Sequence, residues 1–296
     1  MKNGAINRGW SLTKSSWQVL KLDKELAALP VLGIVTSIGA IVILSSAALL
    51  GLGLITHGAS GYHYTGSSND NLIVGALLYF VSTLIANFFN AAIIFGATQR
   101  FNDQDPTIGS SLSGARRKFY PLAAFSLLMS TVGMALRSLE DRLPFAGAIA
   151  VYLLGAAWSV ANIFAIPVIV LSDNSVHPFD ATKQSVQIIK KIWGEGVAVN
   201  LGIAIVGLLS FLAYFTVVIA GFVIGASLHL PVLTGLLFGG IAIIGLFVIA
   251  IILNALSSIG TAALYHYAVT GSAPKMFDGD LLRASISPKK ARKIFS

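Results

Sequence analysis

The sequence predicts an all-α polytopic membrane protein with six transmembrane helices. Hydrophobic residues make up 55% of the 296 residues and charged residues 11%, and the mean hydropathy is +0.81. A soluble domain carries about 25% charged residues, so this chain has too few to cover a water-facing surface. Disorder is excluded because it requires low hydrophobicity. The apolar residues form long continuous runs, which favours helices over the alternating segments of a membrane β-barrel.

Six apolar runs are long enough for a helix to cross about 30 Å of hydrocarbon. They cover 26–56, 72–98, 120–136, 145–172, 197–228 and 232–270. We expect Pro167 to kink the fourth run, because proline removes an intrahelical hydrogen bond. The sixth run exceeds one crossing, so we expect it to bend or to project from the membrane. Gly221 and Gly225 of the fifth run, with Gly235 and Gly239 of the sixth, have the spacing of a close helix contact.

In the predicted topology the basic residues lie mainly on one side of the membrane. The two termini, loop 99–119 and loop 173–196 carry 18 of the 20 Lys and Arg residues, whereas the opposite loops carry Arg137 and Arg142. Short loops rich in Lys and Arg remain cytoplasmic. We therefore expect a multi-pass protein with both termini in the cytoplasm.

Each pair of spans follows a segment with the periodicity of an amphipathic helix. Asp105-Pro106 and His177-Pro178 open the second and third segments, since Asp is a good N-cap and proline suits the first helical position. The expected stripes are Ile6, Trp10, Thr13, Trp17 and Leu20; Ile108, Leu112, Ala115 and Phe119; and Phe179, Val186, Ile189 and Trp193.

These segments predict three hairpins, each preceded by a cytoplasmic interfacial helix. The repeat-like units cover about 1–98, 99–172 and 173–270 of one transmembrane domain, with a cytoplasmic tail at 271–296. The tail contains Leu281, Leu282 and Ile286 and is a candidate fourth interfacial helix. The alternative is that loops of any polytopic protein look basic and amphipathic.

Trp and basic side chains in these segments are candidates for contact with lipid headgroups. Trp anchors at the membrane–water boundary, and Lys reaches the headgroups with its long side chain. We expect anionic lipids as partners at the cytoplasmic face, and no nucleic acid. The candidates are Trp10, Lys14, Trp17, Lys21, Arg116, Arg117, Lys118, Lys190, Lys191 and Trp193.

Uncharged polar residues recur at one expected depth of the even-numbered spans. Asn90, Asn162 and Ser258 each lie sixteen residues before a proline on the cytoplasmic side. Two interpretations are open: a polar layer that lines a solute path, or hydrogen bonds of about 0.6–2 kcal/mol that hold the helices together. The candidate mid-membrane layer is Asn87, Asn90, Ser159, Asn162, Asn254 and Ser258.

The sequence offers little chemistry for catalysis. The chain has no cysteine, and its histidines fall in no HExxH pattern, so we expect no metal site and no cofactor. Nucleophile-elbow and phosphate-loop motifs are absent from the sequence. Arg137 and Asp141 are four residues apart and are expected to form a surface ion pair. These observations predict that the protein is not an enzyme.

Several short motifs resemble one family of prokaryotic six-span membrane proteins that is known only as a domain of unknown function. The motifs are Arg8-Gly9-Trp10, Ser16-Trp17, Arg137-Ser138-Leu139, Ala157-Trp158-Ser159, Pro167-Val168, Ser185, Lys191-Ile192-Trp193-Gly194-Glu195, Ala263-Leu264-Tyr265, Tyr267-Ala268 and Gly271. The resemblance covers nearly the whole chain. It implies a prokaryotic plasma membrane and the same six-span layout, and it brings no known activity or site residue.

Two hypotheses for function follow. The first is a non-enzymatic membrane protein that organises lipids or partner proteins at the cytoplasmic face. The alternative is a small-solute channel or transporter that uses the polar mid-membrane layer.

Overall fold

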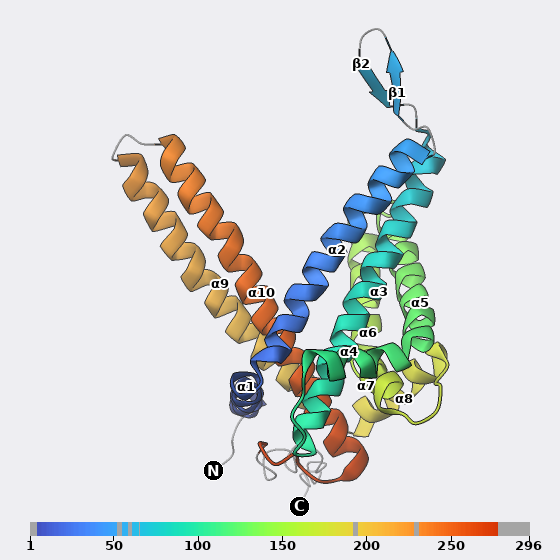
Figure 1. Cartoon of the computed structure of the whole chain (residues 1–296), viewed down its shortest axis with the longest axis vertical. Coiled ribbons are helices and arrows are strands. Elements are labelled where there is room, and N and C mark those ends of the chain that lie inside the picture. Colours follow the sequence, from blue (N-terminus) through green and yellow to red (C-terminus); the bar gives the residue numbers. More distant parts are fainter. Residues whose placement is uncertain are drawn as a thin grey trace, which may run out of the picture. The chain divides into compact units, whose positions relative to one another are not determined.

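The computed structural model describes residues 5–51, 55–58, 61–64, 66–191, 195–227 and 231–277, and helices make up almost all of this part (Figure 1). The elements are α1 (Ala5–Leu22), α2 (Lys24–Gly51), β1 (Ile55–Gly58), β2 (Gly61–Tyr64), α3 (Ser68–Phe101), α4 (Ile108–Arg117), α5 (Phe119–Glu140), α6 (Phe145–Ala161), α7 (Ala165–Leu171), α8 (Pro178–Lys191), α9 (Glu195–Ser227) and α10 (Pro231–Thr270). Strands β1 and β2 pair antiparallel, with Ile55 opposite Tyr64. The all-α prediction is therefore right for the described chain apart from this short ladder.

Six helical segments of the described chain are long and apolar enough to cross a membrane, as predicted. They are Lys24–Gly51, Asn69–Phe101, Phe119–Glu140, Phe145–Leu171, Gly207–Gly225 and Leu237–Thr270. Many of their large apolar side chains are exposed, including Ile43, Leu153 and Ile244. Such exposure suits a surface in contact with lipid tails, whereas in water it would be unfavourable.

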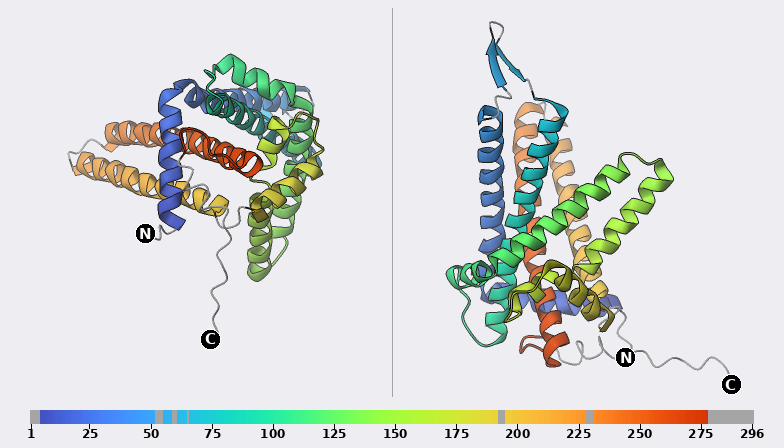
Figure 2. Two further views of the ribbon diagram at one scale, coloured as in Figure 1. Left: turned by 90° about the horizontal axis from the view of Figure 1, so that it is seen from below. Right: turned by 90° about the vertical axis from the view of Figure 1, so that its right-hand side faces the viewer.

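The chain divides into two compact units. One comprises Met1–Ala27, Ala97–Pro106 and Lys190–Ser296, and the other comprises Ala28–Gly96 and Thr107–Ile189. In the first unit α9 and α10 pack side by side, and α1 crosses both of them (Figure 2). In the second unit α5 packs against α6.

The fourth predicted span consists of two helices rather than one kinked helix. Helix α6 ends at Ala161 and α7 begins at Ala165, so the interruption precedes Pro167. Pro167 has no amide hydrogen to donate to the carbonyl of Ile163, which weakens the helix at this point. The prediction of a proline effect is right, but the chain breaks at Asn162–Phe164 instead of bending.

Helix α4 begins later than Asp105-Pro106. Thr107 is its N-cap: its hydroxyl accepts from the Ser110 amide, and the Thr107 amide donates to the Ser110 hydroxyl. This reciprocal capping fixes the start at Ile108, whereas Asp105 pairs with Arg100. The predicted stripe also included Phe119, which lies in α5 and is 41% exposed.

Helix α8 begins at Pro178 as predicted, but its buried face differs from the predicted stripe. Pro178, Ala181, Ser185 and Ile189 are buried at helical spacing, whereas Phe179 is exposed. Small residues on this face allow the helix to lie close to its neighbours, and a bulky Phe at a neighbouring position faces outwards. Trp193 and the predicted tail helix lie outside the described residues.

Candidate functional site

The predicted stripe on α1 contains both buried and exposed side chains. Thr13 and Leu20 are buried, whereas Trp10 and Trp17 are 58% and 37% exposed. Lys14 is also exposed and lies one turn from each tryptophan. An exposed Trp–Lys–Trp face is typical of a helix at a membrane surface.

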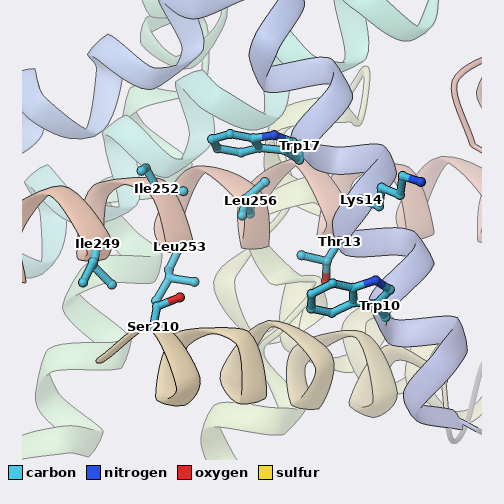
Figure 3. Close-up of a pocket in the computed structure, with 9 residues that line it drawn as sticks. All are labelled: Trp10, Thr13, Lys14, Trp17, Ser210, Ile249, Ile252, Leu253 and Leu256. Atoms are coloured by element: carbon cyan, nitrogen blue, oxygen red, sulfur yellow. The ribbon is translucent and has the colours of Figure 1, made fainter. Parts of the chain in front are cut away.

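This face of α1 forms one wall of a groove of about 500 Å³ within the first unit. The volume lies in the range of roughly 300–1,000 Å³ that is usual for small-molecule sites. Figure 3 shows residues of α1, α9 and α10 facing the same space. The lining residues are Trp10, Thr13, Lys14, Trp17, Ser210, Ile249, Ile252, Leu253 and Leu256.

The groove is mainly apolar, and its polar side chains do not gather at one end: Ser210 lies beside Ile249 and Leu253, whereas Lys14 lies at the α1 rim (Figure 3). Lys14 directs its ammonium group away from the end where Ile249 lies (Figure 3). Lys21, one further turn along α1, places its Nζ 5.6 Å from the centre of the Trp17 ring. This distance is suitable for a cation–π attraction, which orients the ring and keeps a second positive charge close to the groove.

Helices α9 and α10 hold the apolar wall in place by packing large side chains against glycines. A Cβ atom on Gly207 would lie 2.7 Å from a Leu253 methyl group. Tyr214 packs directly over Gly245, and its hydroxyl donates to the Ile241 carbonyl. These contacts fix the helix register, so that Ile249, Ile252 and Leu256 of α10 line the groove together with α1.

The predicted glycine contact between these helices is right in part. Gly221 lies directly under the Phe238 ring, so no side chain could replace its hydrogen without movement. Gly239 has open space around its Cα. The surroundings of Gly235 lie outside the described residues.

An ion pair fixes the start of α2 relative to the end of α3. Asp23 is the residue between α1 and α2, and it is buried. Arg100 donates from both Nε and a terminal nitrogen to its carboxylate, with an Nε–Oδ2 distance of 2.6 Å, and also pairs with Asp105. Such a two-point contact restricts orientation as well as distance. Sequence analysis missed this pair, although a lone acid at a helix junction was a possible signal.

Two predicted headgroup residues bind backbone carbonyls in the structure. The Lys118 ammonium donates to the carbonyls of Ser172, Asp173 and Asn174, the first at 2.6 Å. The Lys191 ammonium donates to the Ala268 carbonyl at 2.6 Å. Both lysines thus donate hydrogen bonds to carbonyl groups at or beyond helix C-termini, where a positive charge is favourable.

The other predicted headgroup residues on α4 and α8 stay on the surface. Arg116, Arg117 and Lys190 are exposed near the ends of their helices. The candidates that line or adjoin the groove are therefore the four on α1.

The predicted polar layer makes hydrogen bonds within each unit. Asn87 Nδ2 donates to the Ser126 hydroxyl at 2.9 Å and so links α3 to α5. Ser159 and Ser258 donate to carbonyls four residues earlier in their own helices, those of Gly155 and Asn254. Asn90 also has a polar partner. Asn254 and Ser258 belong to the other unit from the rest.

Asn162 of this layer stabilises the interruption between α6 and α7. Its Nδ2 donates to the Trp158 carbonyl at 2.9 Å, and its Oδ1 accepts from the Thr182 hydroxyl at 2.7 Å. The Phe164 amide donates to the Ser185 hydroxyl at 3.0 Å. Side chains of α8 thus satisfy backbone and amide groups freed by the break, which an apolar environment requires.

The structure has the features of a multi-pass helical membrane protein. It has six helical segments apolar enough to span a membrane, with large apolar side chains exposed along them. The chain belongs to a family of unknown function (DUF6159), whose sequence profile matches residues 70–275. The family agrees with the resemblance found from short motifs. No curated protein matches the sequence at a significant level.

Proposed function

We propose that this protein is a non-enzymatic lipid-binding membrane protein that holds an anionic phospholipid in the α1 groove. In this proposal the six spans form three hairpins, each preceded by an interfacial helix, with both termini in the cytoplasm of a prokaryote. The observation that carries the proposal is the position of Lys14 at the rim of an apolar groove, between Trp10 and Trp17 of the same helix. A lipid held at this site would also offer its headgroup to partner proteins at the cytoplasmic face.

The apolar wall and the ammonium group play different parts in the proposal. Lipid tails are already in an apolar solvent, so their contact with Ile249 or Leu253 gives packing and little net hydrophobic gain. The positive charge of Lys14 attracts an anionic headgroup by about 1 kcal/mol near a membrane surface. Selectivity for headgroup charge therefore arises at Lys14, and the tryptophans fix the depth of α1.

Quenching of Trp10 and Trp17 by brominated lipid tests the proposal. Trp158→Phe and Trp193→Phe substitutions leave only these two tryptophans of the four in the chain as reporters. The protein is reconstituted in phosphatidylcholine bilayers with small amounts of brominated phosphatidylglycerol or brominated phosphatidylcholine. We expect stronger quenching by the anionic lipid, and equal quenching by both lipids would refute the proposal.

A second candidate function is a small-solute path through the membrane. The interruption at Asn162 favours it, because discontinuous spans occur at the substrate sites of many transporters. Efflux of uncharged solutes from proteoliposomes is the test, with an Asn90→Ala/Asn162→Ala variant as comparison. Flux that vanishes while the variant remains folded would support the path. Loss of folding in the variant would support a packing role for both amides.

A further inference from the structure

A second cleft lies between α5 and α6 in the other unit from the α1 groove. Its volume is about 630 Å³, and Tyr79 of α3 contributes to its wall. Small residues, Gly133 on α5 and Gly155 on α6, line it and leave room between the two helices. A Cβ on Gly133 would lie 2.6 Å from the Tyr79 hydroxyl, so only glycine lets this ring lie so close.

Three charged residues gather at one end of this cleft. Arg137, Glu140 and Asp141 all line it, at the end of α5 that leads into the connection to α6. Asp141 lies four positions after Arg137, a rise of about 6 Å along a helix. The predicted pair between them is wrong: in the described part of the chain none of the three forms an ion pair. Helix α5 ends at Glu140, and Asp141 is its C-cap.

The rest of the cleft has both apolar and polar lining: Tyr79 and Ser159 contribute hydroxyl groups, and the buried Trp158 Nε1 has no hydrogen-bond partner among the described residues. Met129, Leu136 and Val151 line it together with Trp158. Both helices are candidate membrane spans, so the cleft opens between surfaces that contact lipid. An amphiphile with a charged head at Arg137 and a chain along Met129 and Leu136 would therefore match the charged end and the apolar part of the cleft.

We propose that this cleft binds a phospholipid with a phosphoethanolamine headgroup. Arg137 binds the phosphate, since a guanidinium group presents paired donors to phosphate oxygens. Glu140 and Asp141 accept hydrogen bonds from the primary ammonium group. One acyl chain lies between α5 and α6 against Trp158. The proposal depends on α5 and α6 spanning the membrane, and it is independent of the α1 groove.

The charge pattern distinguishes this headgroup from other common ones. An anionic phosphatidylglycerol headgroup would satisfy Arg137 but would leave two carboxylates beside a negative charge. A choline headgroup carries a positive charge but has no N–H group to donate to Glu140 or Asp141. Only a zwitterion with a primary ammonium group among these three complements one guanidinium and two carboxylates.

Fluorescence of Trp158 reports on the occupant of this cleft. Trp10→Phe, Trp17→Phe and Trp193→Phe substitutions leave Trp158 as the single tryptophan of the full chain. Brominated phosphatidylethanolamine, phosphatidylcholine and phosphatidylglycerol are compared at equal mole fraction in phosphatidylcholine bilayers. We expect an apparent preference for phosphatidylethanolamine over phosphatidylcholine of about tenfold, the effect of one charge-assisted hydrogen bond.

Matched variants determine whether the charges cause this preference. Glu140→Gln/Asp141→Asn should reduce the ratio towards one, because an amide oxygen still accepts a hydrogen bond from the ammonium group but no longer attracts it by opposite charge. Arg142→Gln removes a neighbouring charge that does not line the cleft, and it should preserve the ratio. Circular dichroism and gel filtration verify that each variant is folded.

Four results would overturn the proposal. They are equal quenching by all three lipids, stronger quenching by phosphatidylcholine or phosphatidylglycerol, a preference that survives in the folded Glu140→Gln/Asp141→Asn variant, and relief of quenching by free phosphoethanolamine. The last result would show that a soluble zwitterion, rather than a lipid, occupies the cleft.

Discussion

Lys14→Gln removes the ammonium group at the rim of the α1 groove and leaves its apolar wall unchanged. The walls from α9 and α10 make no use of Lys14, since Tyr214 and Leu253 hold them against glycines. One basic residue near a membrane surface contributes about 1 kcal/mol to attraction of an anionic lipid, which is a factor of about five. We therefore expect about a fivefold loss of preference for phosphatidylglycerol over phosphatidylcholine.

The assay is quenching of Trp10 and Trp17 by brominated lipids, with Lys24→Gln as the matched control. Lys24 is exposed, carries the same charge and lies outside the groove. Lys21 remains beside Trp17, so a residual preference is expected in Lys14→Gln. The difference should shrink at 1 M salt, where the screening length falls to about 3 Å. An equal loss in Lys14→Gln and Lys24→Gln would show that the groove does not select the headgroup.

Two further substitutions test the packing described above. Gly245→Ala should destabilise the protein by about 1–3 kcal/mol, because the new Cβ displaces the Tyr214 ring; thermal unfolding in detergent measures this, and an unchanged melting temperature would contradict it. Gly239→Ala is its control, since no other atom lies within 4 Å of the added Cβ. Ser185→Ala should leave the buried Phe164 amide without its partner, at about 1–3 kcal/mol, and accelerate hydrogen exchange at that amide; unchanged exchange would show that the hydroxyl does not stabilise the break.

The six spans could be predicted because a helix in lipid must be apolar along its whole length. The break in the fourth span was harder to place. Pro167 marked the weak point, but the position of the break depends on Thr182 and Ser185, which lie about 20 residues away on α8. No periodicity within a single span reveals such partners. The start of α4 depends on capping by Thr107. The local sequence contains two candidate N-caps, Asp105 and Thr107, and only the structure shows that Asp105 pairs with Arg100 instead.

The candidate site was predicted in part. The stripe on α1 contained Trp10 and Trp17, but sequence periodicity alone did not separate them from the buried Thr13 and Leu20. A helix that contacts protein on one side and lipid on another is apolar on both sides. Its hydrophobic pattern therefore does not reveal which side is buried in the protein. Lys118 and Lys191 contact carbonyl groups of residues that are far away in the sequence. A basic residue in a loop predicts headgroup contact whether or not such a carbonyl partner exists, so the sequence did not distinguish the two roles.

The cytoplasmic location of both termini is the claim on which the proposed α1 lipid site depends. Labelling of single cysteines with a membrane-impermeant maleimide tests it directly, because the native chain has no cysteine. Asn69 and Ser113 are suitable exposed positions at opposite predicted faces, and Ser67 is less suitable because it caps α3 through Asp70. Asn69→Cys should react in intact cells and Ser113→Cys only after permeabilisation. Reaction of both positions from the same side would contradict the proposed topology.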